Sequence, residues 1–332
     1  MSNISVLENL GVSIRRRHVL AQYYSKIINR QLEKLQPDAV VAVAAAHKIA
    51  YIDHKWPLIY VADAMYATVV NYYGKYANVN AKARLRGNAI QCALLERADR
   101  ILLSSQWAAD AAHTAYDLSP ECLRVVPLGA NLDADPGYQP PTANGPVTLL
   151  FVGFAWERKG GPLLLEIWRE LRRRTGDAEL HIVGARPKEA IGCDGVVLHG
   201  KIHKSNHEDY QRLVQLYRRS SFMVMPSREE AYGIVYCEAA AFGRPAVAAR
   251  TGGVVGIIDD DRTGLLLDLE ASPADYADRI LRTWQDHERY ATMCLNARRK
   301  YEDRLNWNAW GDGVVGALGE VLGKEVGASL GT

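Results

Sequence analysis

The sequence predicts an α/β protein built from two domains. At 332 residues the chain is longer than one compact core usually supports, and it suits two domains of about 150 residues each. Short, continuously apolar runs alternate with amphipathic stretches, and such runs are typical of strands buried on both faces of a parallel sheet. Ligands of open parallel sheets bind at the carboxyl ends of the strands. The polar residues that follow these runs are therefore the first candidates for a functional site.

Composition narrows the class of protein. The formal net charge of +2 is nearly balanced, which argues against nucleic acid as the main partner. The five cysteines form no CxxC pair, which favours a reduced compartment over a disulfide framework. No apolar run reaches the roughly 18–20 residues needed to cross a bilayer, and the first residues lack a signal-peptide pattern. We therefore expect a cytoplasmic protein, either soluble or peripheral to a membrane.

The first predicted domain, residues 1–130, begins with an amphipathic helix over residues 12–36. Its apolar side chains repeat at helical spacing, and its basic side chains, including Arg15, Arg16 and Arg17, outnumber the acidic ones. Such a helix can lie on the inner face of a membrane against anionic lipid. It can also dock within the protein and leave its basic face in solvent. The sequence leaves both possibilities open.

Buried strands alternate with helices in the rest of this domain. The predicted strands are 39–45, 57–62, 101–103 and 123–126, and the predicted helices are 87–97 and 106–116. Asp63 comes directly after the second of these strands, so it lies at the edge of the sheet where a ligand would bind. It could equally cap the helix that follows.

Residues 131–146 are rich in proline and glycine and have no hydrophobic period, so they predict a linker. The linker contains Asp133 and Asp135, which form a DxD pattern. Paired carboxylates suit Mg²⁺ or Mn²⁺ bridging a diphosphate. No strand delivers this pair to a sheet edge, so we expect no metal site there.

The second predicted domain, residues 147–305, opens with a buried strand at 147–152. Gly153, Arg158 and Lys159 follow it, just before a predicted helix at 162–175. Two cations beside glycines at the start of a helix are typical of a phosphate-binding loop. The loop lacks the patterns of a Walker ATPase and of a dinucleotide fingerprint. On their own, two adjacent basic residues could also be ordinary surface charges.

Further strands and helices complete this domain. The strands are predicted at 179–183, 196–198, 221–225 and 246–249, and the helices at 233–242, through 273–303, and at 308–322. His199, His203 and His207 have a spacing that suggests a metal site. A glycine and a Ser-Asn pair interrupt any helix that would place them on one face, so we expect no zinc site.

The stretch from Met225 to Val255 is a strand, a loop, a helix and a second strand. Glu230 lies in the loop, and Glu238 lies in the second turn of a helix that begins after Gly233. A carboxylate that far inside a helix does not stabilise its first turn, but it can accept hydrogen bonds from a polyol above the strand ends. A solvated loop glutamate and an ordinary helix glutamate are the alternative explanation.

The wider pattern supports a functional interpretation. It consists of Pro226, Ser227, Glu230, Tyr232, Gly233, Glu238, Gly243, Pro245, Gly252 and Gly253. At this spacing it resembles the signature of family 4 retaining glycosyltransferases. The resemblance implies the GT-B fold, with two Rossmann-like lobes, a cleft between them, and a C-terminal helix over residues 306–332 that returns to the first lobe. It is strong over 147–268 and weaker in the first lobe, which we expect to be truncated because nothing before Ala39 predicts the usual first strand and glycine-rich loop.

The resemblance also implies an activity. The chain would move a sugar from a UDP-, GDP- or ADP-linked donor to a saccharide, lipid-linked or small-molecule acceptor, with retained configuration and without a metal. Arg158 and Lys159 would neutralise the departing diphosphate, Glu230 would hold the sugar and Glu238 the ribose. Asp63 is the nearest polar candidate in the first lobe, because Ala62 stands where the family usually has a histidine. We therefore predict Glu230, Arg158, Lys159 and Asp63 as catalytic, and Gly153, Arg158, Lys159, Lys201, Ile202, Glu230, Tyr232, Gly233, Ile234 and Glu238 as donor-binding.

Other functions remain open at the sequence level. A protein with an intact second lobe and an impaired first lobe would bind a nucleotide sugar without transferring it efficiently. An epimerase of nucleotide sugars can share the same fold, although the acid and base positions do not favour that chemistry.

Overall fold

The computed structural model describes residues 18–141 and 145–323. The chain divides into two compact units. The first consists of Met1–Pro127 and Gly311–Thr332, and the second of Leu128–Trp310. Within the described residues each unit is built on a parallel sheet, with four strands in the first and six in the second, which confirms the predicted α/β class.

The sheet of the first unit has the order β1-β2-β3-β4. These strands are Val40–Val43, Leu58–Ala62, Arg100–Leu103 and Leu123–Val125, and every neighbouring pair is parallel. All of β2 is buried because it lies inside the sheet, as its apolar run predicts. At the edge of the sheet, Val41 and Val43 of β1 are 39% and 58% exposed. Asp63 follows β2 directly.

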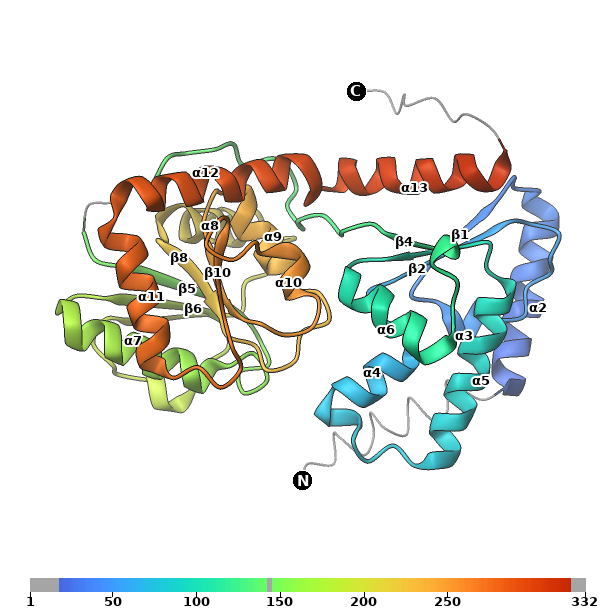
Figure 1. Ribbon diagram of the computed structural model, residues 1–332, viewed down its shortest axis with the longest axis horizontal. Helices are drawn as coiled ribbons and strands as arrows, with labels where there is room; N and C mark the ends of the chain where they lie inside the picture. The colour runs from blue at the N-terminus through green and yellow to red at the C-terminus, as the bar shows by residue number, and fades with distance from the viewer. Residues whose placement is uncertain (1–17, 142–144, 324–332) are drawn as a thin grey trace. The chain divides into compact units, whose positions relative to one another are not determined.

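In the first unit, α2 precedes β1, and the next four helices connect the strands (Figure 1). These helices are α2 (His18–Leu35), α3 (Ala46–Ile49), α4 (Tyr66–Tyr72), α5 (Ala81–Arg97) and α6 (Gln106–Tyr116), with short 3-10 turns at Gly74–Tyr76 and Pro120–Cys122. Helix α5 begins earlier than predicted because the Asn80 side chain accepts a hydrogen bond from the Ala83 N–H and caps it.

Helix α2 accounts for the described part of the helix predicted over 12–36. Residues 12–17 of that prediction lie outside the described residues. Ala21, Ser25 and Leu32 of α2 are buried. Three of its apolar residues, Val19, Tyr23 and Leu35, are 77%, 59% and 72% exposed. Within the described part of the chain, no helix combines the length and the apolar character needed to cross a membrane.

The six strands of the second unit have the order β10-β9-β8-β5-β6-β7. They are β5 (Thr148–Gly153), β6 (Glu179–Gly184), β7 (Val196–Gly200), β8 (Phe222–Met225), β9 (Ala246–Ala249) and β10 (Gly264–Leu267), all parallel. Strands β5 to β7 extend toward one edge and β8 to β10 toward the other. The order therefore reverses between β5 and β8, and the carboxyl ends at such a reversal form a crevice for ligands.

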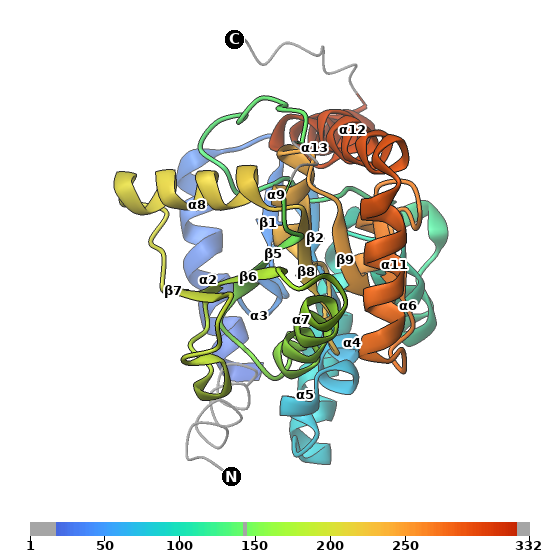
Figure 2. The same ribbon diagram turned by 90° about the vertical axis from the view of Figure 1, so that its left-hand side faces the viewer.

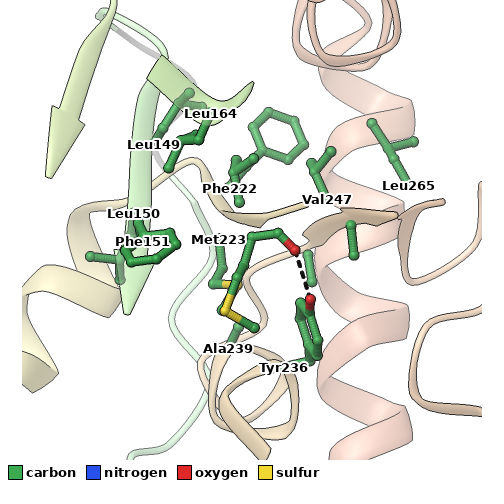
Figure 3. Packing of buried hydrophobic residues seen from close by; sticks show 14 of the residues in the cluster. Leu149, Leu150, Phe151, Leu164, Phe222, Met223, Tyr236, Ala239, Val247 and Leu265 are labelled. Carbon is green, nitrogen blue, oxygen red and sulfur yellow. Dashed lines mark hydrogen bonds between the residues drawn. The ribbon is translucent and has the colours of Figure 1, made fainter. Parts of the chain in front are cut away.

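Helices cover both faces of this sheet (Figure 2). Helices α7 (Gly161–Thr175) and α11 (Pro273–Gln285) pack together on one face, and α8 (His207–Arg219), α9 (Ile234–Ala241) and α12 (His287–Arg304) lie on the other. The short helix α10 is Val254–Ile257. Figure 3 shows the core on both faces of this sheet, with Leu149, Phe222 and Val247 on the face that holds Leu164 of α7 and Met223 on the opposite face beside Ala239 of α9.

The final helix, α13 (Trp307–Leu322), belongs to both units. Its first residues are part of the second unit, and from Gly311 onward it is part of the first. Glu320 near its end pairs with Arg100 at 3.0 Å and with Arg124 at 3.3 Å. The predicted return of the C-terminal helix to the first lobe is therefore confirmed.

The segment predicted as a linker, 131–146, lies in the second unit, and its residues 142–144 are outside the described residues. Asp135 of the DxD pattern forms an ion pair with Arg298. Both of its carboxylate oxygens accept hydrogen bonds from Arg298 of α12 at 2.7 Å, and the Arg298 guanidinium lowers the pKa of Asp135. This carboxylate supports the position of the segment against α12.

Candidate active site

A cavity of about 460 Å³ lies at the carboxyl ends of β5 and β6, beside the point where the strand order of the second unit reverses. All of its lining residues belong to the second unit. They are Asn131, Val152, Gly153, Phe154, Ala155, Arg158, Lys159, Val183, Gly184, Ile202, Lys204, Leu213, Ile234, Val235 and Glu238. The lining thus combines apolar side chains with three cations and one carboxylate.

Two glycines bring backbone directly to the cavity. Gly153 and Gly184 end β5 and β6 and pair in register. Gly184 has a positive φ of 92°, and a Cβ there would lie 2.6 Å from the Gly153 carbonyl oxygen. Glycine is therefore required for this close approach. Phe154 follows Gly153 and is 65% exposed at the cavity.

The loop after β5 carries Arg158 and Lys159. The Lys159 ammonium forms an ion pair with the Glu230 carboxylate, and its side chain is only 15% exposed. Burial lowers the pKa of Lys159, and the nearby Glu230 charge opposes that change. Arg158 donates a hydrogen bond to the Glu229 carbonyl at 2.7 Å and lies 4.0 Å from the Glu230 carboxylate. Both cations therefore lie beside the loop that follows β8.

Gly160 fixes the position of this loop. It has a positive φ of 74°, and a Cβ at this residue would overlap the carbonyl oxygen of Pro226. Only glycine accommodates both the backbone conformation and the contact. The Arg228 N–H also donates to the Arg158 carbonyl at 2.9 Å. The two loops that contribute charge to the site are therefore joined through their backbones.

Helix α9 begins at the cavity. Gly233 precedes it with a positive φ of 97°, where a Cβ would lie 2.5 Å from the Tyr236 ring. Among the described residues, no side chain caps this helix, and Ile234 and Val235 in its first turn line the cavity. Backbone N–H groups at a helix start favour an anion, so this turn can act together with Arg158 and Lys159 on a phosphate.

Glu238, in the second turn of α9, is the buried carboxylate of the cavity and is 1% exposed. It accepts hydrogen bonds from the Lys204 ammonium at 2.5 Å and the Tyr217 hydroxyl at 3.0 Å. Lys204 also donates to the Asn131 carbonyl at 2.8 Å. Burial raises the pKa of Glu238, whereas Lys204, Tyr217 and the Asn131 backbone lower it.

The structure brings most of the predicted donor-binding residues together. Gly153, Arg158, Lys159, Ile202, Ile234 and Glu238 line the cavity. Glu230 and Gly233 lie beside it, since Glu230 pairs with Lys159 and Gly233 precedes α9.

The remaining predicted residues lie elsewhere. Lys201 is exposed and is not among the residues that line the cavity. Tyr232 is 4% exposed and donates its hydroxyl to the Leu128 carbonyl at 2.7 Å, so it anchors the site loop to the start of the second unit. Asp63 is in the first unit, and the residue at the cap position of α4 is Met65 rather than Asp63.

The histidines considered for a metal site are arranged differently from a ligand cluster. His199 of β7 stacks on His181 of β6, with 2.8 Å between His181 Nδ1 and His199 Nε2. Burial lowers the pKa of His199 to about 4. In the part of the chain that the structure describes, no group of three or more histidine, cysteine, aspartate or glutamate side chains could hold a metal ion.

Sequence reasoning missed Lys204 and Tyr217. Lys204 lies in an irregular loop after β7, and Tyr217 faces inward from α8. The amphipathic period of residues 207–219 would have revealed the helix that carries Tyr217. No local signal identifies Lys204, because its two acceptors come from distant segments of the chain.

A parallel sheet with a reversed strand order, whose crevice is lined by three cations and one buried carboxylate, defines a doubly wound α/β domain with a ligand crevice at its carboxyl ends. Residues 146–286 match the protein family described as "Glycosyl transferases group 1". Over these residues the match confirms the resemblance on which the sequence prediction was based.

Individual proteins give the same assignment. A D-inositol 3-phosphate glycosyltransferase from Corynebacterium kroppenstedtii is 28% identical over 242 residues, which cover 64% of this chain and 51% of the relative. The chain therefore spans about half the length of that curated relative.

Solved structures show the same fold. A glycosyltransferase from Rickettsia africae aligns with a TM-score of 0.71 and 19% identity, over 92% of this chain and 82% of the other. The Anabaena protein Alr3699/HepE, in complex with UDP-glucose, aligns with a TM-score of 0.64 and 16% identity, over 89% of this chain and 82% of the other. These likenesses confirm the predicted GT-B fold.

Proposed function

We propose that this chain is a retaining glycosyltransferase that takes a hexosyl group from a nucleoside-diphosphate sugar. The observation that carries the proposal is the arrangement of the cavity in the second unit. Two cations, the first turn of α9 and the buried carboxylate of Glu238 all line it. This arrangement suits a ligand with a diphosphate next to a ribose.

The proposed chemistry uses charge that the chain itself provides. The bond between the anomeric carbon and the diphosphate oxygen breaks, and the diphosphate leaves with the bonding electrons. Arg158, Lys159 and the first turn of α9 stabilise that negative charge, so no metal is needed for this task. The acceptor hydroxyl then attacks from the same face and gives its proton to the departing diphosphate oxygen, because no carboxylate among the described residues is evidently placed as a covalent nucleophile. Glu230 would hold the sugar hydroxyls.

The acceptor is proposed to be a saccharide, a lipid-linked saccharide or a small molecule, and the location cytoplasmic. Helix α2 supports peripheral membrane contact. Its exposed Val19 and Tyr23 lie on the same side as the exposed Lys26 and Arg30, and this mixture suits an anionic lipid surface. A docked helix with a solvated basic face is the alternative for this segment.

Calorimetry and a transfer assay test the proposal. UDP, GDP and ADP are titrated first, followed by the sugar-linked form of the nucleotide that binds. Glu238→Gln should weaken binding of the nucleotide and the nucleotide sugar alike, because both contain the ribose. Glu230→Gln should weaken only the nucleotide sugar. Binding and turnover should persist in EDTA, and the absence of binding by all three nucleotides would contradict the proposal.

A weakly active nucleotide-sugar-binding protein is the second candidate. The described sheet of the first unit runs in the sequential order β1-β2-β3-β4, without the reversal that forms the crevice of the second unit. Ala62 also ends β2 where the resemblance leads us to expect a histidine. If this candidate is right, donor binding will be normal while transfer stays slow with every acceptor. Rapid transfer by the 332-residue chain would exclude it.

A further inference from the structure

Glu238 has an unusual environment for a carboxylate. It is 1% exposed and lies on a helix whose other residues are mostly apolar. Desolvation favours the neutral acid in such a place, and a protonated carboxyl can accept fewer hydrogen bonds from a ligand. For Glu238 to bind ribose hydroxyls well at neutral pH, the protein must keep its charge.

Three groups from separate parts of the second unit supply that support. All three form hydrogen bonds with the Glu238 carboxylate. They are the Lys204 ammonium in the loop after β7, the Tyr217 hydroxyl in α8, and the backbone of Asn131 near the start of the second unit. Lys204 also bonds to the Asn131 carbonyl, so the ammonium is held between two acceptors. Charge-assisted hydrogen bonds of this kind are about twice as strong as neutral ones.

Tyr217 is fixed independently of any ligand. Its side chain is fully buried, and its ring stacks on Phe242 with a centroid distance of 5.0 Å and an interplanar angle of 7°. Burial raises the pKa of its hydroxyl well above the usual value, so the group stays protonated and can only be a donor toward Glu238. The direction of this hydrogen bond is therefore determined by the protein core.

We propose that Lys204 and Tyr217 are positioning residues for donor recognition. Together they hold Glu238 ionised and oriented, so that the carboxylate accepts a hydrogen bond from a ribose hydroxyl of the donor. The inference rests on the proposed function, in which Glu238 contacts the ribose. The new element is that Lys204 and Tyr217 allow the chain to distinguish ribose from deoxyribose in the nucleotide. Neither residue needs to touch the sugar that is transferred.

The count of hydrogen bonds sharpens this proposal. An ionised carboxylate has about four acceptor sites. Lys204, Tyr217 and the Asn131 backbone occupy three of them. About one site remains, so we expect one of the two ribose hydroxyls to dominate recognition. The 2′-deoxy and 3′-deoxy nucleotides should therefore lose affinity unequally.

The experiment compares ribonucleotides with deoxynucleotides. UDP, GDP and ADP and their 2′-deoxy and 3′-deoxy forms are titrated into the full chain by calorimetry. The wild type should prefer the ribonucleotide by roughly tenfold or more over one deoxy form, as expected for a hydrogen bond to a charged acceptor. In Tyr217→Phe and Lys204→Met this preference should fall to about threefold or less.

Two matched variants serve as controls. Tyr210 is also on α8, but its hydroxyl accepts from the Asp133 N–H, so Tyr210→Phe should keep the full preference for ribose. Lys188 is exposed in a 3-10 turn outside the cavity lining, and Lys188→Met should behave in the same way. A purely structural role of Tyr217 or Lys204 would weaken ribonucleotide and deoxynucleotide equally and leave their ratio unchanged, which would overturn the inference.

A pH series gives a second readout. The charged and titratable groups around Glu238 are Lys204, Tyr217 and its chain neighbour Cys237. As the pH falls, Glu238 takes up a proton and the preference for ribose should decline. Lys204→Met removes a cation that favours ionisation, so the decline should begin at a higher pH than in the wild type.

The possible outcomes separate this inference from the proposed function. If the wild type binds none of the nucleotides, the proposed function fails and the inference fails with it. If the wild type binds nucleotides but does not distinguish ribose from deoxyribose, only the inference fails. A preference that survives in both Tyr217→Phe and Lys204→Met would also overturn it. Because Lys204 is partly exposed, its variant is informative even if Tyr217→Phe folds poorly.

Discussion

Lys159 and Glu230 form an ion pair, and this pairing changes what a substitution at either residue measures. Both side chains are largely buried, at 15% and 9% exposed. Removing one member of a buried pair leaves the other charge uncompensated, which costs more than the pair itself contributes. At this site the remaining charge would also face the ligand.

Lys159→Ala should therefore weaken nucleoside diphosphate binding by about ten- to a hundredfold or more. One part of the loss is a charge-assisted hydrogen bond, worth about 1.5–3 kcal/mol. The other part is repulsion between the diphosphate and the unpaired Glu230. The double variant Lys159→Ala/Glu230→Gln should consequently bind the diphosphate better than Lys159→Ala alone. Calorimetry on the four proteins of this cycle tests the coupling, and additive effects would contradict it.

Two glycines at opposite ends of α7 show how a single element is fixed at the site. Gly160 and Gly176 both have a positive φ, at 74° and 88°. They differ in their surroundings, because a Cβ at Gly160 would overlap the Pro226 carbonyl, whereas a Cβ at Gly176 meets nothing within 4 Å. Backbone strain is thus common to both positions, and the steric conflict belongs to Gly160 alone.

Gly160→Ala should destabilise the protein by about 1–3 kcal/mol more than Gly176→Ala, which should cost only about 1 kcal/mol. The alanine at 160 pushes the Arg158–Lys159 loop away from Pro226, so diphosphate affinity should fall as well. Urea unfolding gives the first quantity and calorimetry the second. Equal losses of stability in the two variants, with unchanged affinity, would show that the contact with Pro226 does not determine the loop.

For single helices, strands and loops, the sequence predicts the structure where the evidence lies within a few neighbouring residues. The apolar runs of β5, β8 and β9 predict those strands because each is buried along its whole length or nearly so. Gly153, Arg158 and Lys159 are recognisable because they follow a strand and precede a helix. Helix α4 was missed, since Val69 and Val70 are β-branched and resemble a strand.

The rest of the site depends on contacts between distant segments. Lys204 reaches Glu238 only because the loop after β7 and the first turns of α9 lie beside the same crevice. The burial of Tyr232 could not be predicted either, because the Leu128 carbonyl that accepts its hydrogen bond is 104 residues away in the sequence. Such pairings follow from the order of strands in the sheet, which propensity and spacing do not encode.

For the whole molecule, pH dependence of stability follows from two carboxyl groups with opposite shifts. Arg298 lowers the pKa of Asp135, so its contribution to stability is present above the usual value of 3.8 and is lost as the pH falls through the lowered pKa. Burial raises the pKa of Glu238 above 4.5, so the native state binds more protons, and stability falls as the pH rises through that interval.

Arg298→Met should therefore destabilise the protein at pH 7 by about 1–2 kcal/mol, a value reduced because Asp135 is half exposed. The effect of the substitution should shrink near pH 3, where Asp135 gains a proton in the variant. Urea unfolding at several pH values measures this, with Arg289→Met on the same helix, which contacts Asp261 instead, as the control. A loss of stability that is constant with pH would assign the role of Arg298 to packing and to its hydrogen bond with the Ala241 carbonyl, rather than to Asp135.

Helix α13 affects the order in which the two units can fold during translation. The first unit needs residues from both sides of the second, and Arg124 and Glu320, which pair within it, are 196 residues apart. A ribosome adds about 5–20 residues each second, so roughly 10–40 seconds separate the synthesis of these two residues. The second unit is made from one continuous segment and can fold during that interval. The earliest residues of the chain thus complete their unit last, and chaperones have the longest access to its sheet.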